Sequence, residues 1–428
     1  MARVCFFQSF AYRCICLSEY YNEYNDVFSI DFETAGESGM KDIIEQMKAE
    51  LWEVFDHLHR HPEISWEEWQ TTEFLCRELE REGYRVRTFA DCPGVVAEIG
   101  AGPFTVGVRS DMDALWQEVN GVWQPNHACG HDAHMTIVLG VAKLLRRIGY
   151  EPPGTLRFLF QPAEEKGTGA LKMIEKGAAD GLTFLYGVHL RPIQEVKGGY
   201  ASPAIIHGAA QCIEGRIRGV AAHAARPHLG VNVIEVGSAI VQELGKIHID
   251  PQVPASIKMT KFHAGEKDAN TIPDYAEFSL DLRAQTNEAM ERLVEGLRHV
   301  INGVAAIYGA EIELVERTRI VAAHPDPDAV RLMEEAIIAA LGTEKCVPPV
   351  VTSGGEDFHF YSFQKPELKT TMLGLGCDLR PGLHHPNMTF RRDDLPSGVE
   401  ILARTVINTF ATFALQGENG RVSVTANH

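Results

Sequence analysis

The chain has 428 residues, 45% of them hydrophobic and 23% charged, which is ordinary globular composition and excludes a fibrous or largely disordered chain. Its net charge of −18 argues against a binder of nucleic acid or anionic membranes, because phosphate groups would be repelled. No run of 18 apolar residues occurs, so we expect no membrane-spanning helix and no membrane partner.

Nine cysteines without a repeated spacing argue against a disulfide framework and favour a reducing, cytoplasmic compartment. Residues 1–39 lack the continuous apolar core of a signal peptide. A helical pattern begins at Met40 and continues through Met47, Leu51 and Leu58. One hypothesis is that Met40 is the natural start and that residues 1–39 are a leader absent from the native protein.

Helices and strands alternate in the first half of the chain. Helical spacing predicts helices from Met40 to Leu58 and over residues 67–82, the second of which ends at Gly83. Apolar runs predict strands over residues 95–99, 105–108, 155–160 and 184–188, and a helix over residues 135–145. This alternation predicts an α/β sheet with covered faces.

Residues 211–318 follow a different order. The pattern predicts a strand, a helix, two strands, a helix and a strand, which is the ferredoxin-like βαββαβ unit. The alternation of helices and strands resumes after residue 320. We therefore predict an α/β domain with a mixed sheet, formed by residues 40–200 and 320–418, that is interrupted by a ferredoxin-like α+β domain at 201–319.

The segment from His127 to His134 contains four His or Cys residues. Cys129 and His131 are two residues apart and can reach a common metal, and thiolate and imidazole suit zinc and similar ions. Asp132 or one of the other two histidines could orient a ligand through a hydrogen bond.

Further candidates directly follow apolar strands, where α/β sheets bind ligands. They are the adjacent Glu164 and Glu165, and His189. One glutamate can ligate a metal while the other acts as general base. Near the chain end, His384 and His385 should provide one ligand and one bystander, because adjacent residues rarely bind one ion.

Three polar residues of the inserted segment form a last group. His223, Asn270 and Arg283 either reach over the site and bind substrate or are ordinary surface residues. Two interpretations also exist for four tryptophans, Trp66, Trp69, Trp116 and Trp123. They either shape an apolar pocket for the acyl group or pack in the core and on the surface. A nucleophile elbow, a Walker loop and an H-E-x-x-H helix are missing.

Eight motifs, in order, resemble the binuclear metallopeptidase and amidohydrolase family of aminoacylases, hippurate hydrolases and auxin-conjugate amidohydrolases, which is peptidase family M20. The segment 114–120 is most similar to AmhX-type amidohydrolases. The eight motifs are Ser110–Leu115, His127–Asp132, Gln161–Glu165, Gly187–His189, His223–His228, Asn270–Pro273, Glu356–Phe358 and Leu383–His384.

The resemblance implies a role for each matching residue. Cys129, bridging two divalent ions, would share their ligation with His131, Glu165, His189 and His384. Zinc or manganese are the first candidates, and cobalt or nickel are compatible. The remaining implied roles are Glu164 as general base, His223 as oxyanion donor, and Asn270, Arg283 and Asp113 as substrate-binding residues.

The implied function is hydrolysis of the amide bond of N-acyl amino acids or small peptides by a metal-activated water. The family also implies that the inserted domain is a lid and a homodimer surface. Two alternatives remain: a catalytically silent metal-dependent binding protein on the same fold, and a single-metal oxidoreductase. The intact Glu164 argues against the first alternative, and the lack of a cofactor fingerprint argues against the second.

Overall fold

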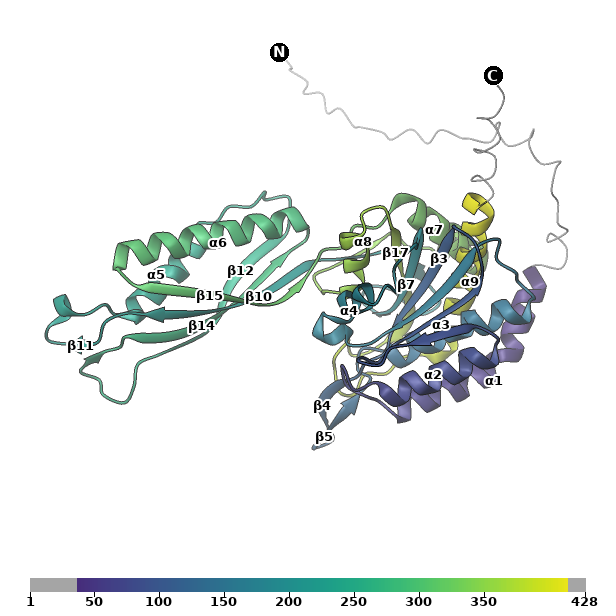
Figure 1. Cartoon of the computed structure of the whole chain (residues 1–428), viewed down its shortest axis with the longest axis horizontal. Helices are drawn as coiled ribbons and strands as arrows, with labels where there is room; N and C mark the ends of the chain where they lie inside the picture. The colour runs from purple at the N-terminus through teal and green to yellow at the C-terminus, as the bar shows by residue number, and fades with distance from the viewer. Residues whose placement is uncertain (1–36, 415–428) are drawn as a thin grey trace, which may run out of the picture. The chain divides into compact units, whose positions relative to one another are not determined.

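Figure 1 shows the computed structural model of the chain, in which residues 37–414 are described. The chain divides into the units Met1–Asp42 and Ile43–His428. Of the first unit, residues 37–42 are described, as the start of α1 (Glu37–Arg60). The leader predicted over residues 1–39 thus falls almost entirely outside the described residues. None of the helices over residues 37–414 combines the length and apolar character that crossing a membrane requires.

The larger sheet of the second unit has seven strands, in the order β1-β2-β6-β3-β7-β17-β8. The central strands β6, β3, β7 and β17 run parallel, whereas the pairs β1–β2, β2–β6 and β17–β8 are antiparallel. The predicted mixed α/β sheet is therefore confirmed. The bounds are β1 Arg85–Thr88, β2 Val95–Gly100, β3 Thr105–Asp111, β6 Thr155–Gln161, β7 Phe184–Pro192, β8 Ala201–Ser202 and β17 Lys369–Leu379.

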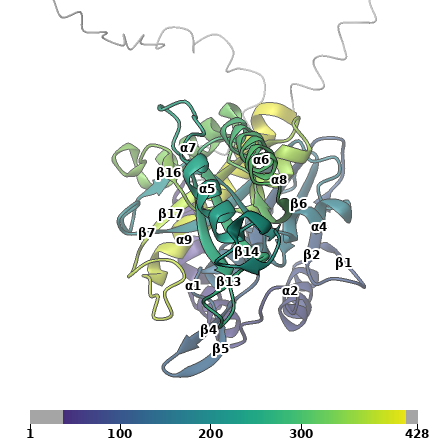
Figure 2. The ribbon, with the colours of Figure 1, turned by 90° about the vertical axis from the view of Figure 1, so that its left-hand side faces the viewer.

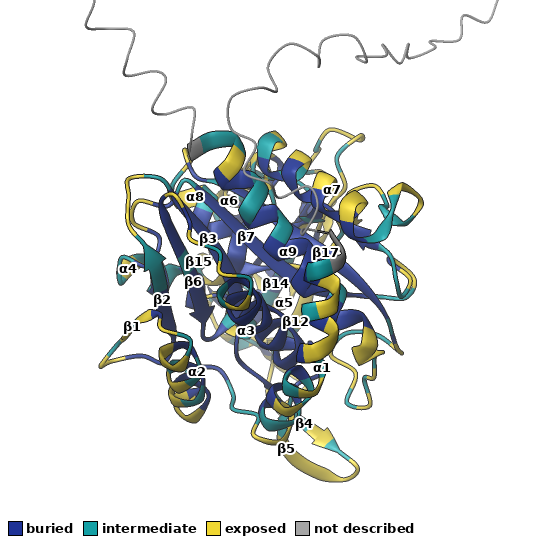
Figure 3. Ribbon diagram, turned by 90° about the vertical axis from the view of Figure 1, so that its right-hand side faces the viewer, coloured by how far each residue is buried: buried dark blue, intermediate teal, exposed yellow. Residues whose placement is uncertain are grey.

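Helices cover both faces of this sheet. Leu185 of β7 packs in a core with α4 and α8, whereas the next residue, Tyr186, shares a hydrogen bond of 2.7 Å with Thr409 of α9 on the opposite face. Helices α3, α9 and α7 lie side by side on that second face, and β3 between the two layers is buried along its whole length (Figure 3). The bounds are α2 Trp69–Arg81, α3 His131–Arg147, α4 Gly169–Glu175, α7 Pro327–Leu341, α8 Phe360–Gln364 and α9 Leu395–Thr409.

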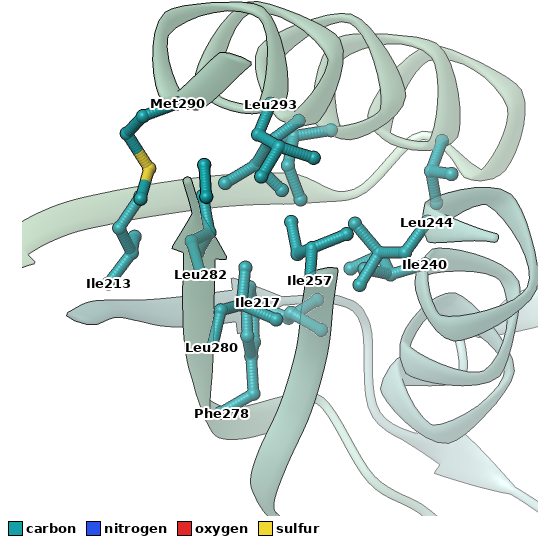
Figure 4. Close-up of a cluster of buried hydrophobic side chains, with 14 of the residues drawn as sticks. Ile213, Ile217, Ile240, Leu244, Ile257, Phe278, Leu280, Leu282, Met290 and Leu293 are labelled. Atoms are coloured by element: carbon teal, nitrogen blue, oxygen red, sulfur yellow. The ribbon is translucent and has the colours of Figure 1, made fainter. Parts of the chain in front are cut away.

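A separate sheet of four antiparallel strands follows the order β12-β14-β10-β15. With α5 and α6 it has the predicted chain order βαββαβ, and its buried apolar residues, among them Phe278 and Leu293, form a core of their own (Figure 4). Its boundaries at 201 and 319 and its function stay predictions. The bounds are β10 Ala209–Arg218, α5 Val233–Leu244, β12 Ala255–Ala264, β14 Tyr275–Ala284, α6 Asn287–Tyr308 and β15 Glu311–Ile320.

Three two-stranded pairs complete the described strands: β4 (Leu115–Val119) with β5 (Val122–Asn126), β9 (Ile205–His207) with β16 (Val350–Thr352), and β11 (Ala222–His223) with β13 (Thr271–Ile272). The β4–β5 hairpin projects from its surroundings as a ribbon of its own (Figures 1 and 2). It directly follows the turn after β3 and precedes Cys129.

Candidate metal centre and active site

The candidate site lies where the parallel strands of the larger sheet end. β3 ends at Asp111, β6 at Gln161, β7 at Pro192 and β17 at Leu379. Because these strands are parallel, their carboxyl ends meet at one edge of the sheet, where α/β folds bind ligands. The segments at this edge, together with the start of α3, supply Cys129, His131, Glu164, Glu165, His189 and His384.

The five predicted ligands meet as two groups of donor atoms that share Cys129. One group is Cys129, His131 and His189, the other is Cys129, Glu165 and His384, and the donor atoms of each lie within 4.8 Å of one another. Sγ of Cys129 lies 3.6 Å from Nε2 of His189. Oε1 of Glu165 lies 3.3 Å from Nε2 of His384. This arrangement suits two cations around one shared thiolate.

Two of the donor atoms, Nε2 of His131 and Oε1 of Glu165, are buried and make no hydrogen bond within residues 37–414, although Oε1 lies within ion-pair distance of His384. Leaving a buried polar atom unpaired costs about 1–3 kcal/mol, so such atoms are rare. Nδ1 of His131 lies 3.2 Å from Oδ1 of Asp113, and Nδ1 of His189 donates to the carbonyl of Leu190 at 2.7 Å. Both rings therefore present Nε2 to the cluster, as metal-binding histidines do. The residues fit divalent cations.

Negative charge is concentrated around these donors. Burial raises the pKa of the Glu164 carboxyl well above its usual value, and the carboxyl groups of Glu356 and Glu165 raise it further. Contact with the Cys129 thiol and with Glu165 raises the pKa of His384 to about 10. Anionic neighbours make both groups bind a proton more tightly. The same concentration of negative charge favours the binding of a cation.

Left-handed backbone shapes three segments of the site. Gly130, between Cys129 and His131, directly precedes α3 and has φ 85°. A residue with a side chain would rarely adopt this backbone conformation. Ala163 has φ 52° and His384 has φ 63°, although neither is glycine. Such residues cost of order 1–3 kcal/mol and concentrate at functional sites, where surrounding contacts hold them.

Asp113 lies beneath His131 and does not line the cavity next to the cluster. Its buried carboxylate accepts hydrogen bonds from Oγ of Ser65 at 2.6 Å, from the backbone N–H groups of Glu164 at 3.2 Å and Glu165 at 3.0 Å, and from His131 at 3.2 Å. Four donors thus share its two oxygens. The expectation that Asp113 binds substrate stays a prediction, and these contacts connect its carboxylate to His131 and to the Glu164–Glu165 turn.

Sequence reasoning missed a buried charge network beside the site. Arg109 is fully buried, and its guanidinium lies 2.8 Å from Asp111, 3.1 Å from Glu356 and 2.9 Å from Asp357. Asp111 in turn accepts a hydrogen bond from Nδ1 of His134 at 2.8 Å. The available signal was the polar sequence that continues an apolar strand: β3 extends past the predicted end at residue 108 and buries Arg109 and Asp111.

A second missed residue, Glu68, supports the glutamate turn η1 (Glu164–Lys166). Glu68 is buried, and its Oε1 accepts a hydrogen bond from the N–H of Ala163 at 2.7 Å. Burial, together with nearby Asp113, raises the pKa of Glu68 to about 8. The helix predicted over residues 67–82 includes Glu68, whereas α2 begins at Trp69 and leaves Glu68 in the preceding loop. The periodicity therefore gave no sign of its buried carboxylate.

The inserted segment contributes one of its three candidates to the site. Arg283 lines a cavity of about 570 Å³ together with Cys129, Glu164 and His384, and its guanidinium pairs with Asp281. His223 at the end of β11 and Asn270 directly before β13 are exposed and do not line this cavity. Their roles toward substrate stay predictions.

The structure also places His385 and the four tryptophans relative to the donor groups and the cavity. His385 is exposed and its Nδ1 accepts from the N–H of Asn387 at 3.1 Å, so His384 alone of the two enters a donor group. Trp69, Trp116 and Trp123 are 47–59% exposed, and none of the four tryptophans considered lines the cavity.

Comparisons with known proteins agree with this geometry. The profile of peptidase family M20/M25/M40 matches residues 107–408. N-acetylcysteine deacetylase of Bacillus subtilis is 31% identical over 375 residues, which cover 83% of this chain and 95% of the relative. IAA-amino acid hydrolase ILR1-like 2 of Arabidopsis thaliana is 30% identical over 394 residues, covering 85% of this chain and 88% of the relative.

A solved structure is similar over most of the chain. The YXEP protein of Bacillus subtilis, a dinuclear metal binding peptidase from the M20 family, matches with a TM-score of 0.74 and 28% identity, covering 86% of this chain and 100% of that one. The chain therefore belongs to peptidase family M20/M25/M40 and is a metal-dependent hydrolase of amide or peptide bonds.

Proposed function

We propose that the chain hydrolyses the amide bond of N-acyl amino acids or small peptides at a site for two divalent cations. The observation that carries this proposal is the pair of donor groups sharing Cys129, with the Glu164 carboxylate beside them. The names of the relatives, a deacetylase of N-acetylcysteine and a hydrolase of IAA-amino acids, support an acyl-amino acid substrate. The narrower likeness to AmhX-type amidohydrolases stays a prediction.

Each cation would be held by one donor group: Cys129, His131 and His189 for one, and Cys129, Glu165 and His384 for the other. When bound, two such ions lower the pKa of a shared water and stabilise negative charge on the substrate's carbonyl oxygen. Thiolate, imidazole and carboxylate ligands suit zinc or manganese first, and also cobalt or nickel. The dinuclear metal binding of the similar structure supports the count of two.

Glu164 would move the proton. Its side chain lines the cavity, and its Oε2 lies 4.0 Å from the unpaired Nε2 of His131. A carboxylate in this place accepts the proton of the attacking water and donates it to the leaving amine. The raised pKa of Glu164 favours this role, because a carboxyl group that binds its proton more tightly is a stronger base.

The cavity, of about 570 Å³, lies in the range of small-molecule sites. Arg283 at its wall would bind the carboxylate of the substrate, and His223 and Asn270 would join it if the inserted domain closes as a lid. Exclusion of water by such a closure would strengthen each of these electrostatic contacts.

A cytoplasmic location and a homodimer belong to the same proposal. Among residues 37–414 six cysteines are free, as expected in a reducing compartment. Strand β12 forms an edge of the four-stranded sheet, and α5 beside it exposes Ile234 and Val241, which supports a dimer surface there. Sedimentation at the mass of one chain would contradict the dimer.

Adjacent glutamates provide the experiment that tests the reaction. Glu164→Gln should retain both ions and lose turnover by about 10²–10⁴-fold, the usual contribution of a general base. Glu165→Gln is the matched comparison, and we expect it to lose an ion as well as turnover. Both variants are assayed for bound metal and for amine release from N-acetyl amino acids. Turnover of Glu164→Gln within tenfold of wild type would remove Glu164 from its proposed role.

A further inference from the structure

We propose that Gln117, on the β4–β5 hairpin, is a positioning residue that holds His384 in place and thereby supports one of the two cation sites selectively. This inference rests on the proposed function, because it concerns the donor group Cys129–Glu165–His384. It assigns a structural role to a hairpin that the proposed reaction does not use.

The hairpin directs two amides at the loop that carries His384. Nε2 of Gln117 donates to the backbone carbonyl of His384 at 2.8 Å. Nδ2 of Asn126 donates to Oε1 of Gln117 at 3.1 Å and to the carbonyl of Pro386 at 3.1 Å. Asn126 therefore orients the Gln117 amide so that its NH₂ group faces His384, and the pair holds the loop at two points.

The pairing register explains why these amides face inward. Leu115 pairs with Asn126 and Gln117 with Gln124, so Gln117 and Asn126 are diagonal neighbours on one face of the hairpin. Trp116 and Trp123 lie on the alternate positions and are exposed. The hairpin thus turns the amides of Gln117 and Asn126 to the His384 loop and its two tryptophans to solvent.

His384 needs this support more than the other donors do. Its side chain is 53% exposed, whereas that of Glu165 is 9% exposed and those of Cys129, His131 and His189 are buried. Packing therefore fixes the other donors but not His384. Its backbone also has φ 63°, a conformation that a non-glycine residue keeps only when neighbouring contacts hold it.

Hydrogen bonds supply what packing does not. The N–H of His384 donates to the carbonyl of Ala128, next to Cys129, at 2.7 Å. The carbonyl of His384 accepts from Gln117, so both backbone polar groups of this residue are hydrogen-bonded. Loss of the Gln117 bond would release the carbonyl side of His384 and let the ring leave the donor group.

The effect should be confined to one cation site. The group Cys129–His131–His189 is oriented by Asp113 and by the carbonyl of Leu190, neither of which contacts the hairpin amides. Loss of a residue that orients a metal ligand typically lowers metal affinity about 10- to 100-fold. We expect that loss at the site with His384 and little change at the other.

The chain offers an isosteric variant and a matched control. Gln117→Glu keeps the size of the side chain and the acceptor for Asn126 but removes the donor to His384. Gln117→Met removes the donor without adding charge. Gln124→Glu adds the same charge on the cross-strand partner of Gln117, which is exposed and for which the structure gives no side-chain hydrogen bond to residues 37–414.

The experiment is a titration of metal-stripped full-length protein with Co²⁺, followed by calorimetry and by the visible absorption of the bound ion. Wild type and Gln124→Glu should bind two Co²⁺ ions. Gln117→Glu and Gln117→Met should bind one ion with unchanged affinity and the other about 10- to 100-fold more weakly. His384→Ala provides the benchmark spectrum for loss of that site.

Two results would overturn the inference. If both Gln117 variants bind two ions as wild type does, the hairpin does not position His384. If both sites weaken equally, the hairpin has only a general structural role. Fewer than two Co²⁺ ions on wild type would instead contradict the proposed function itself, and the inference would fall with it.

Discussion

Replacing Asp113 by asparagine separates a positioning role from a substrate-binding role. The carboxylate accepts four hydrogen bonds within the protein, whereas an asparagine of the same shape has one acceptor oxygen and one NH₂ group. In the better orientation the NH₂ group faces Ser65, whose hydroxyl can turn to accept, and the N–H of Glu165 loses its acceptor. One buried unpaired donor costs about 1–3 kcal/mol, which we expect as the loss in unfolding free energy.

The same substitution replaces the charged acceptor of His131 by a neutral amide oxygen, which weakens that hydrogen bond, so ion binding should weaken about 10- to 100-fold. The assay combines urea unfolding with competition against a chelator for Zn²⁺, and Glu118→Gln on the exposed face of the hairpin serves as control. A substrate-binding Asp113 predicts the opposite pattern: a higher KM with unchanged ion affinity and unfolding. That pattern would refute the positioning role.

Two further substitutions test the energetics of the fold. Burial raises the pKa of Glu68 from 4.5 to about 8, so between these values the folded chain holds a proton that the unfolded chain releases. The unfolding free energy of metal-stripped wild type should therefore fall relative to that of Glu68→Gln as the pH rises from 5 to 8. The expected slope is at most about 1.4 kcal/mol per pH unit. If the difference in urea midpoint between wild type and Glu68→Gln does not change with pH, this expectation is wrong. The control is Glu67→Gln, at the exposed neighbouring position, whose difference from wild type should not change with pH. A Cβ at Gly215 would overlap the ring of Phe278, so Gly215→Ala should destabilise by about 1–3 kcal/mol. Gly303→Ala, in an open position of α6, should instead stabilise by about 0.5–1 kcal/mol, and equal effects of the two substitutions on the thermal midpoint would argue against this packing.

Elements with strong periodicity were predictable from sequence. The fourth element predicted within residues 211–318, a strand, is β14 (Tyr275–Ala284), and the fifth, a helix, is α6 (Asn287–Tyr308). Their apolar residues alternate or recur at helical spacing because one face of each packs on the core. The family resemblance likewise predicted the five donors that meet around Cys129.

Other elements depended on contacts between distant parts of the chain. β17 lies between β7 and β8 in the sheet, although about 180 residues separate it from β7 in sequence, and no local pattern reveals that pairing. The β4–β5 hairpin did carry a local signal, because Asn120-Gly121 is a typical two-residue hairpin turn and both residues have positive φ. The contacts of Asp113 could not be predicted, because a sequence motif does not show which donors surround a carboxylate.

Amine release tests the central claim most directly. Metal-stripped protein would be supplied with Zn²⁺, Mn²⁺, Co²⁺ or Ni²⁺ in turn and given a panel of N-acyl amino acids and dipeptides. The proposed function predicts release only after an ion is restored, maximal at two ions per chain, with one substrate class preferred. No release with any ion, from protein that unfolds cooperatively and binds two ions, would contradict hydrolysis of this substrate class.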